Sequence, residues 1–95
     1  MSTAAEIAHS LIVLGSSRTR LGVRATVALY LGEEEVFCDE VRLWKARSRE
    51  VFIKGCLKIL NIEKEEAGKT REKIDKWLRE QNANTFIFGE LKWTP

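Results

Sequence analysis

The sequence predicts a small α+β domain, in which a mostly antiparallel sheet carries a two-helix hairpin on one face. Three observations predict this fold: apolar residues alternate with polar ones along residues 23–31, recur every three or four positions along 45–60, and alternate again along 85–93. The chain has 95 residues, and two separate cores within that length would each be too small to be stable alone. We therefore expect a single domain over residues 1–95.

Two neighbouring segments predict an antiparallel hairpin. Along residues 23–31, Val27 and its alternating neighbours share one side of the strand, whereas Arg24 lies on the other side. The Gly-led turn GEEE follows, and residues 35–43 predict a second strand, so a hairpin is the simplest pairing. In this second strand Asp39 shares a face with apolar residues, which predicts a bulge or the end of regular pairing there.

A short apolar run precedes the hairpin, and the sequence leaves its structure open. The run HSLIVLG ends at Gly15, and the SSRTRLG that follows is typical of a turn. Residues 10–14 are compatible with a further strand. They are also compatible with the end of a helix that begins in TAAEIA, so residues 1–15 are either strand or helix.

Two helices are predicted over residues 45–60 and 63–81. The first has one apolar stripe, formed by Val51, Phe52, Cys56, Ile59 and Leu60. Gly55 weakens this helix by about 1 kcal/mol relative to alanine and allows a close contact with a neighbouring element. Asn61 is a natural cap between the helices, and the glutamates after it suit the positive end of a second helix. The second helix is expected to have four inward residues, Ile62, Ala67, Ile74 and Leu78. Trp77 is expected at the flank of this helix.

The composition argues against several classes of protein. No apolar run approaches the roughly 20 residues of a membrane span, and the first run lacks the basic flank of a signal peptide, so we expect a cytoplasmic protein. Cys38 and Cys56 are too far apart for a metal or redox motif, and we expect both to be buried, reduced thiols. His9 is the only histidine and is expected to be structural. Without a nucleophile–base pair, paired carboxylates or a ligand cluster, we expect no enzymatic activity, metal or cofactor.

Basic residues are concentrated in two parts of the chain, although 16 basic and 14 acidic residues leave a net charge of only +2. No acid lies between Glu6 and Glu33, and from Arg42 to Lys58 six bases are accompanied by Glu50 alone. Segregated charge of this kind can form a basic face. The candidate phosphate contacts are Arg47, Arg49, Lys54 and Lys58 in the first helix, with Arg18, Arg20 and Arg24 as a second patch and Trp44 as a stacking partner.

Each of these features also has a structural interpretation. Arginines at the positive end of a helix are unfavourable there and could instead pair with Asp39, Glu40 or Glu50. The loop LGSSRTRLG has glycines, hydroxyls and arginines but lacks the GxxxxGK[ST] order, so a polar turn is preferred over a phosphate loop. The acids of GEEEVFCDE would suit a cation or, as we prefer, an edge strand kept soluble by its charge.

The segment VALYLGEEEVFCDEVRLWKARSREVFIKGCLKIL resembles part of the DNA primase-like proteins of bacteria and phages that carry a CHC2-type zinc finger and a TOPRIM domain. In those proteins a strand pair ends in Asp-x-hydrophobic-x-Leu-aromatic, and a helix of the type Ser-Ala-Arg-x-Arg-x-x-Phe follows. The matching residues, within about residues 22–80, are Asp39, Val41, Leu43, Trp44, Ala46, Arg47, Arg49, Phe52 and Ile53. Arg42 and Lys45 depart from the small or acidic cap usual in that family.

This resemblance covers only an accessory segment. The four zinc ligands of such proteins are absent from this sequence, and so is the Glu with an Asp-x-Asp pair that holds magnesium. The resemblance therefore implies a non-catalytic module associated with DNA replication, either stand-alone or part of a larger protein. Primer synthesis does not carry over to it.

Two functions from different classes follow. The first is a nucleic-acid-associated module that holds the phosphate backbone of single- or double-stranded nucleic acid through a basic helix face. The second is a protein-interaction or assembly module. Its last strand, from about Phe86 to Trp93, is apolar on both sides and would pair at a sheet edge with a protein partner or a second copy.

Overall fold

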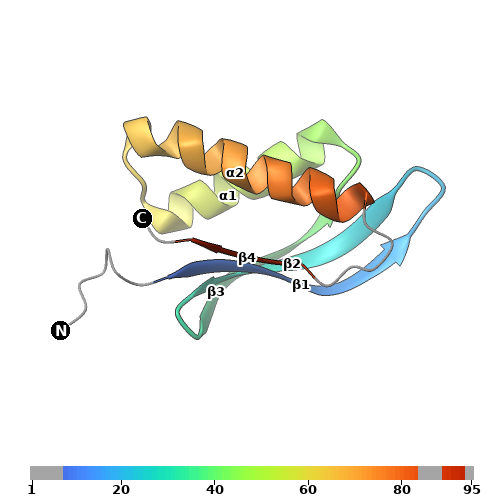
Figure 1. The fold of residues 1–95 in the computed structure, drawn as a ribbon, viewed down its shortest axis with the longest axis horizontal. Coiled ribbons are helices and arrows are strands. Elements are labelled where there is room, and N and C mark those ends of the chain that lie inside the picture. The colour runs from blue at the N-terminus through green and yellow to red at the C-terminus, as the bar shows by residue number, and fades with distance from the viewer. Residues whose placement is uncertain (1–7, 84–88, 94–95) are drawn as a thin grey trace.

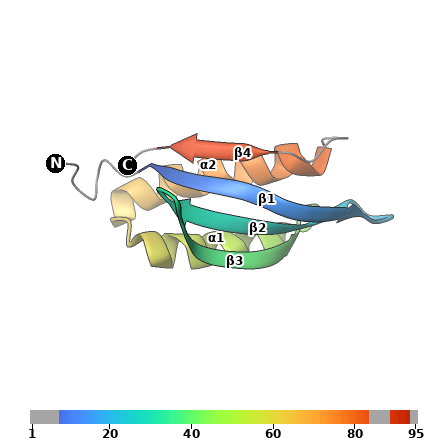
Figure 2. The same ribbon diagram turned by 90° about the horizontal axis from the view of Figure 1, so that it is seen from below.

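The computed structural model describes residues 8–83 and 89–93. In chain order its elements are the strands β1 (His9–Arg18), β2 (Val23–Leu31) and β3 (Glu34–Arg42), the helices α1 (Ala46–Leu60) and α2 (Lys64–Ala83), and the strand β4 (Glu90–Trp93). The strands form one antiparallel sheet in the order β3-β2-β1-β4. Both helices pack on the same face of this sheet, as Figure 1 shows, and no described helix covers the opposite face (Figure 2). The predicted α+β fold is therefore confirmed.

The core lies between the sheet and the helices because one face of each central strand and one side of each helix are apolar. On β2 the predicted alternation holds, since Val23, Val27 and Leu29 are fully buried whereas Arg24 is exposed. The helices close over this face with Phe52, Ile53, Cys56, Ile74 and Leu78. Burying one side chain of this size contributes about 1.5–3 kcal/mol to stability. The buried side chains between sheet and helices therefore hold these elements in fixed relative positions.

The first strand, β1, is longer than the sequence predicted. It continues past Gly15 to Arg18, so that only residues 19–22 form the turn. A register shift between Val13 and Gly15 places Leu14 in a bulge, where it is 50% exposed. The open question about this segment is answered in favour of a strand, with residues 1–7 outside the described part. The turn predicted over SSRTRLG is wrong for its first three residues, which pair with β2. Their polar side chains suggested a turn, but strand pairing uses backbone groups and does not require apolar side chains.

The third strand, β3, keeps regular pairing at Asp39, contrary to the expected bulge. Asp39 lies opposite Val27, and the register shift occurs instead where Leu29 and Tyr30 pair with β3. The carboxylate stays exposed although its neighbours on that face are apolar, because β3 is at the edge of the described sheet. Cys38 was expected to be buried and is exposed, since alternation turns it to the face without helices.

Helix α1 packs through a narrower stripe than predicted. Its buried residues are Phe52, Ile53 and Cys56. Val51 and Ile59, which the prediction placed inward, are 60% and 40% exposed because they lie at the margin of the packed stripe. The expected close contact at Gly55 is confirmed: a Cβ there would lie 2.7 Å from Cζ of Phe37. The Phe37 ring stacks on that of Phe52, with centroids 5.5 Å apart.

The connection between the helices is shaped by Asn61, which ends α1. Its backbone is left-handed, with φ 51° and ψ 45°, and its N–H donates to the carbonyl of Leu57 at 3.0 Å. Helix α2 begins at Lys64, and its buried residues are Thr70, Ile74, Trp77, Leu78 and Gln81. The predicted flank position of Trp77 is wrong, because its side chain is only 6% exposed and belongs to the core.

The last strand, β4, pairs with the beginning of β1, from His9 opposite Trp93 to Ile12 opposite Glu90. The rings of His9 and Trp93 meet edge-on with centroids 5.3 Å apart, which supports the structural role expected for His9. Of the predicted strand over 85–93, the part from residue 85 to 88, with Phe86, lies outside the described residues. No described helix is both long and apolar enough to cross a membrane.

Candidate functional site

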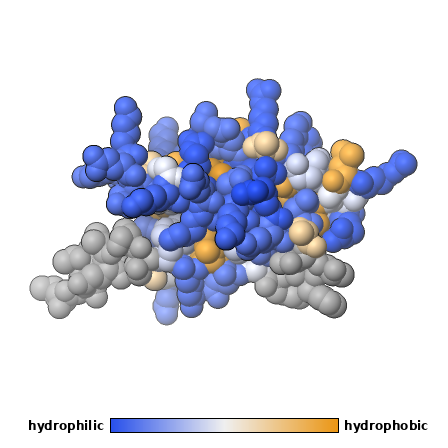
Figure 3. Space-filling model, turned by 45° about the horizontal axis from the view of Figure 1, so that its top comes forward, coloured by the Kyte–Doolittle hydropathy of each residue, from blue (hydrophilic) through white to orange (hydrophobic). Residues whose placement is uncertain are grey.

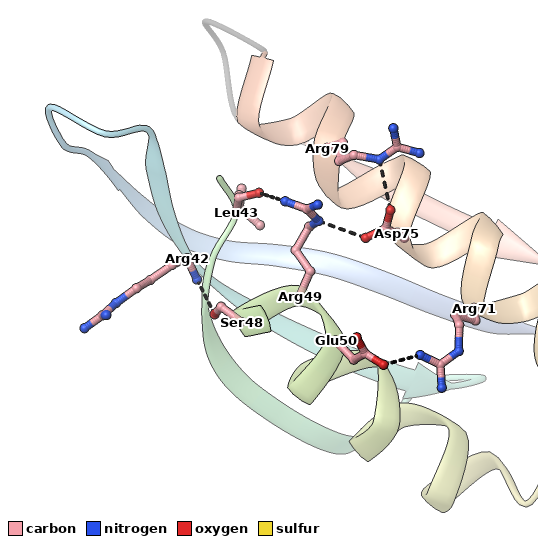
Figure 4. A network of polar contacts seen from close by, with 8 residues as sticks. All are labelled: Arg42, Leu43, Ser48, Arg49, Glu50, Arg71, Asp75 and Arg79. Atoms are coloured by element: carbon pink, nitrogen blue, oxygen red, sulfur yellow. Dashed lines mark hydrogen bonds and ion pairs between the residues drawn. The ribbon is translucent and has the colours of Figure 1, made fainter. Parts of the chain in front are cut away.

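The basic residues of α1 and α2 divide into those that hold the fold together and those that do not. Arg49 belongs to the first group: its Nε donates to Oδ1 of Asp75 at 2.8 Å, and its Nη1 donates to the carbonyl of Leu43 at 2.8 Å. Its side chain is only 12% exposed and points from α1 toward α2 (Figure 4). Asp75 also accepts from Nε of Arg79 at 2.9 Å. Arg49, a predicted phosphate contact, is thus engaged in joining the strand end, α1 and α2.

The acids expected to neutralise the start of α1 pair with other arginines. Glu50 accepts from Nη1 of Arg71 on α2 at 2.9 Å, and both side chains are largely exposed. Glu40 lies 3.6 Å from Nε of Arg24 on the neighbouring strand. Among the described residues, the start of α1 therefore receives no ion pair from the acids that the sequence suggested.

Three arginines instead converge on a recess beside Trp44, at the end of the molecule where the β1–β2 hairpin turns. This concavity of about 930 Å³ is lined by Thr19, Arg20, Leu21, Arg24, Arg42 and Trp44, and we call it the Trp44 recess. Its residues come from the hairpin turn, the first part of β2, the last residue of β3 and the connection to α1. Figure 1 shows this hairpin extending beyond the helices. The recess therefore gathers residues that are up to 25 positions apart, from Thr19 to Trp44.

The hairpin turn is held in shape by Thr19. Its backbone N–H donates to the carbonyl of Gly22 at 2.6 Å, and its hydroxyl donates to the same carbonyl at 2.8 Å. The hydroxyl also accepts from the N–H groups of Leu21 and Gly22, each at 3.2 Å. This turn presents Leu21 with 73% of its surface exposed and places Arg20 on the wall of the recess.

Trp44 lies close against the backbone of Gly22. Gly22 has a φ of +151°, and a Cβ there would lie 2.7 Å from Oδ1 of Asn82 and 2.8 Å from Cβ of Trp44. The same Asn82 oxygen accepts from the N–H of Val23 at 2.9 Å, which ties the end of α2 to the start of β2. The N–H of Leu43 donates to the carbonyl of Val23 at 2.9 Å. The wall that carries Trp44 is thus built into the domain on three sides.

Arg42 joins the Trp44 recess to a smaller hollow at the start of α1. This second hollow has a volume of about 220 Å³ and is lined by Asp39, Glu40, Arg42, Lys45, Arg47, Ser48, Val51 and Phe52. The N–H of Arg42 donates to Oγ of Ser48 at 2.9 Å, while its side chain extends away from α1 (Figure 4). Lys45 occupies the N-cap position without a side-chain cap, and the first turn of α1 contains no acid.

We use the name basic end for the residues Arg20, Arg24, Arg42, Lys45 and Arg47, which line these two neighbouring hollows. Within residues 8–83 and 89–93, only Arg24 of this set has an ion pair, and that pair is exposed. An exposed pair contributes little energy, so it leaves Arg24 available for exchange with another anion.

The predicted contacts are therefore only partly brought together. Arg20, Arg24 and Trp44 share the Trp44 recess, and Arg47 lies in the neighbouring hollow. The other predicted contacts do not line either hollow: Lys54 and Lys58, which are exposed on α1, Arg18 at the end of β1, and Arg49. The sequence prediction missed Thr19, Leu21, Arg42 and Lys45. Arg42 and Lys45 could have been found from the sequence, because they lie on either side of Trp44.

The described residues offer little for covalent or metal chemistry. Burial raises the pKa of the Cys56 thiol to about 12, and burial with the nearby Glu35 and Asp39 raises the pKa of Cys38, so neither thiol is activated as a thiolate. Across the described part of the chain, no three His, Cys, Asp or Glu side chains are grouped as metal ligands would be. What the basic end can do chemically is to bind an anion and to place an aromatic ring beside it.

Comparison with known proteins adds no relative: no family model, no curated protein and no solved structure matches this chain.

Proposed function

We propose that this protein is a non-catalytic module that binds nucleic acid through its phosphate backbone, using the basic end. The observation that carries the proposal is the Trp44 recess. Three arginines from separate segments line one concavity with a tryptophan, and only Arg24 among them has an ion pair in the described residues. The arginines between the helices, in contrast, are neutralised by acids. Guanidinium groups bind phosphate oxygens well, and an aromatic ring beside them is typical of nucleic-acid surfaces.

The electrostatics of α1 support the same proposal. Positive side chains at a helix N-terminus oppose the helix dipole and cost roughly 0.3–1 kcal/mol each at exposed sites. Lys45 and Arg47 lie there without an acid in the first turn. A phosphate at this end would be favoured by both side chains and by the dipole, so the arrangement suits an anionic partner better than it suits the isolated domain.

The resemblance to the accessory segment of primase-like proteins supports the choice of nucleic acid among anionic partners. It is carried by residues around the same site, including Asp39, Trp44 and Arg47. We accordingly place the module in DNA replication, in the cytoplasm, without a catalytic step of its own.

The test is a binding titration. Fluorescence anisotropy of a labelled 20-nucleotide DNA strand is measured at 25, 75 and 150 mM salt with the wild type and with the variant R20Q/R24Q/R42Q. We expect affinity to fall with salt with a logarithmic slope of about −0.7 per phosphate contact, and the triple variant to flatten the slope by about 2. Absence of binding at 25 mM salt would refute the proposal.

A matched control separates the site from net charge. The variant K69Q/K73Q/K76Q removes three positive charges from exposed positions of α2. Figure 3 shows that the surface on the helix side of the molecule is mostly hydrophilic. We expect it to keep most of the wild-type affinity. Equal losses in the two triple variants would show that binding depends on total charge and not on the basic end.

A second candidate is assembly through β4. The two edges of the described sheet differ: β3 has four acids and one base, whereas β4 has one acid and one base. Charge of one sign discourages edge-to-edge pairing at β3, and β4 lacks this protection. Sedimentation between 5 and 200 μM would test the candidate, which predicts a mass that rises with concentration, and a constant monomer mass would exclude it.

A further inference from the structure

We infer that the Trp44 recess receives a single unstacked nucleobase, so that the protein selects single-stranded over duplex nucleic acid. This inference rests on the proposed function and specifies its substrate class. It depends on the composition of the recess, on its rigidity and on what each form of nucleic acid can present to it.

The composition of the recess suits a base together with its flanking phosphates. Trp44 and Leu21 provide apolar surface, and Arg20, Arg24 and Arg42 provide positive charge around it. The recess is wide and open to solvent, with a volume of about 930 Å³, so a base can reach Trp44 while its flanking phosphates stay at the rim. A surface that bound phosphate alone would need the arginines but not a concavity containing a tryptophan and a 73% exposed leucine.

The recess is also formed before any ligand arrives. Trp44 lies against Gly22, whose missing side chain makes room for it, and Asn82 holds the adjacent strand through Val23. The bond from the N–H of Lys45 to the carbonyl of Arg42, 3.0 Å long, closes the turn that contains Trp44. The backbone on both sides of Trp44 is therefore held in place before a base stacks there, which reduces the entropy lost on binding.

Duplex and single strand differ in what they offer to such a recess. In a duplex the bases are paired and stacked inside the helix, and one must be flipped out at a cost in free energy before it can enter. In a single strand the bases are accessible, and every base has a π-face that can stack on an aromatic side chain. A duplex would reach the arginines only through its backbone and would leave the Trp44 ring unused.

The test changes the ligand and leaves the protein intact. Anisotropy titrations at 75 mM salt compare a labelled oligothymidine of 12 nucleotides, a 12-residue abasic strand with the same phosphates, and a 12-base-pair duplex. We expect the oligothymidine to bind at least about fivefold more tightly than the other two, since stacking of one base corresponds to roughly a fivefold to hundredfold gain.

Intrinsic fluorescence provides a second readout. Trp77 and Trp93 are 6% and 8% exposed, so quenching by the oligothymidine should come mainly from Trp44 and disappear in W44L. W44F should keep part of the preference over the abasic strand, because it retains an aromatic ring, whereas W44L should lose it. The variant R20Q/R24Q/R42Q should lower the affinity for all three ligands by similar factors.

The possible results separate this inference from the proposed function. If the abasic strand or the duplex binds as tightly as the oligothymidine, with the salt dependence described above, the inference is overturned and backbone binding stands. If none of the three ligands binds at 75 mM salt or when the titrations are repeated at 25 mM, both are overturned. A preference for oligothymidine that W44L leaves unchanged would also overturn the inference, because it would place the base elsewhere.

Discussion

The two helices begin in opposite ways. The first turn of α2 contains Glu65 and Glu66, which complement the positive end of the helix dipole. The first turn of α1 contains no acid, and its N-cap residue, Lys45, provides no side-chain hydrogen bond. At its N-terminus α2 thus has charges that favour a helix, whereas α1 has charges there that oppose one. The difference indicates that the start of α1 is stabilised by contacts from elsewhere in the fold.

Tertiary contacts supply the stabilisation that α1 lacks locally. Arg49 connects the first turn of α1 to Asp75 in the middle of α2 and to the carbonyl of Leu43 just before the helix (Figure 4). These bonds hold α1 in place without using Lys45 or Arg47. Arg49 therefore has a structural role, whereas Lys45 and Arg47 have no ion pair within the described residues.

The largest effect is expected from removing this anchor. The variant R49A should lower the free energy of unfolding by about 2 kcal/mol, because it removes two charge-assisted hydrogen bonds from a mostly buried side chain. Asp75 remains partly exposed and keeps Arg79, which limits the loss. R71A, which removes only an exposed pair, is the control and should cost about 0.5 kcal/mol or less. Urea unfolding measures both, and equal losses would contradict the assignment.

Giving α1 the start that it lacks should stabilise the domain and weaken binding. Lys45 already has the extended backbone of an N-cap residue, with φ −104° and ψ 114°. K45D should therefore raise the free energy of unfolding by about 1 kcal/mol through a new cap and a favourable charge. It should also reduce affinity for a DNA strand severalfold. K45S adds the cap with a smaller change of charge, and a parallel rise in stability and affinity in either variant would contradict the proposal.

The reverse change at α2 tests the other half of the comparison. E66Q removes an acid from the first turn and should lower the free energy of unfolding by about 0.5 kcal/mol, while leaving DNA affinity nearly unchanged. E80Q, an exposed substitution nearer the end of the same helix, serves as the matched charge control. A large change in DNA affinity in E66Q alone would show that the start of α2 takes part in binding.

The smallest effect is expected where an acid competes with phosphate. E40Q removes the partner that lies 3.6 Å from Arg24 and should increase affinity for a DNA strand about twofold to threefold. E72Q, on exposed α2 surface, makes the same change of charge away from the basic end. Anisotropy at low salt compares the two, and an equal increase in both would assign the effect to net charge alone.

Much of the fold follows from local patterns. The alternation around Val27 and the three-four repeat around Phe52 predicted β2 and α1 almost to the residue, because each pattern reports which side of an element is apolar. The extension of β1 over Gly15–Arg18 did not follow, since it depends on backbone pairing with β2. Nor did the exposure of Val51, which depends on which residues of α1 the packing against the sheet and α2 actually covers.

For the site, the sequence by itself determined that positive charge collects around Trp44 and in the turn before β2. Only the tertiary structure decided which of these charges remain available. Arg47 and Arg49 are two positions apart in the same basic run. Helical periodicity predicts that they point in different directions, but it does not predict which of them pairs with an acid. Asp75, 26 positions beyond Arg49, lies within reach of that arginine because α2 packs beside α1. Neutralisation of a charge depends on distance in space, and the folding of the chain sets that distance.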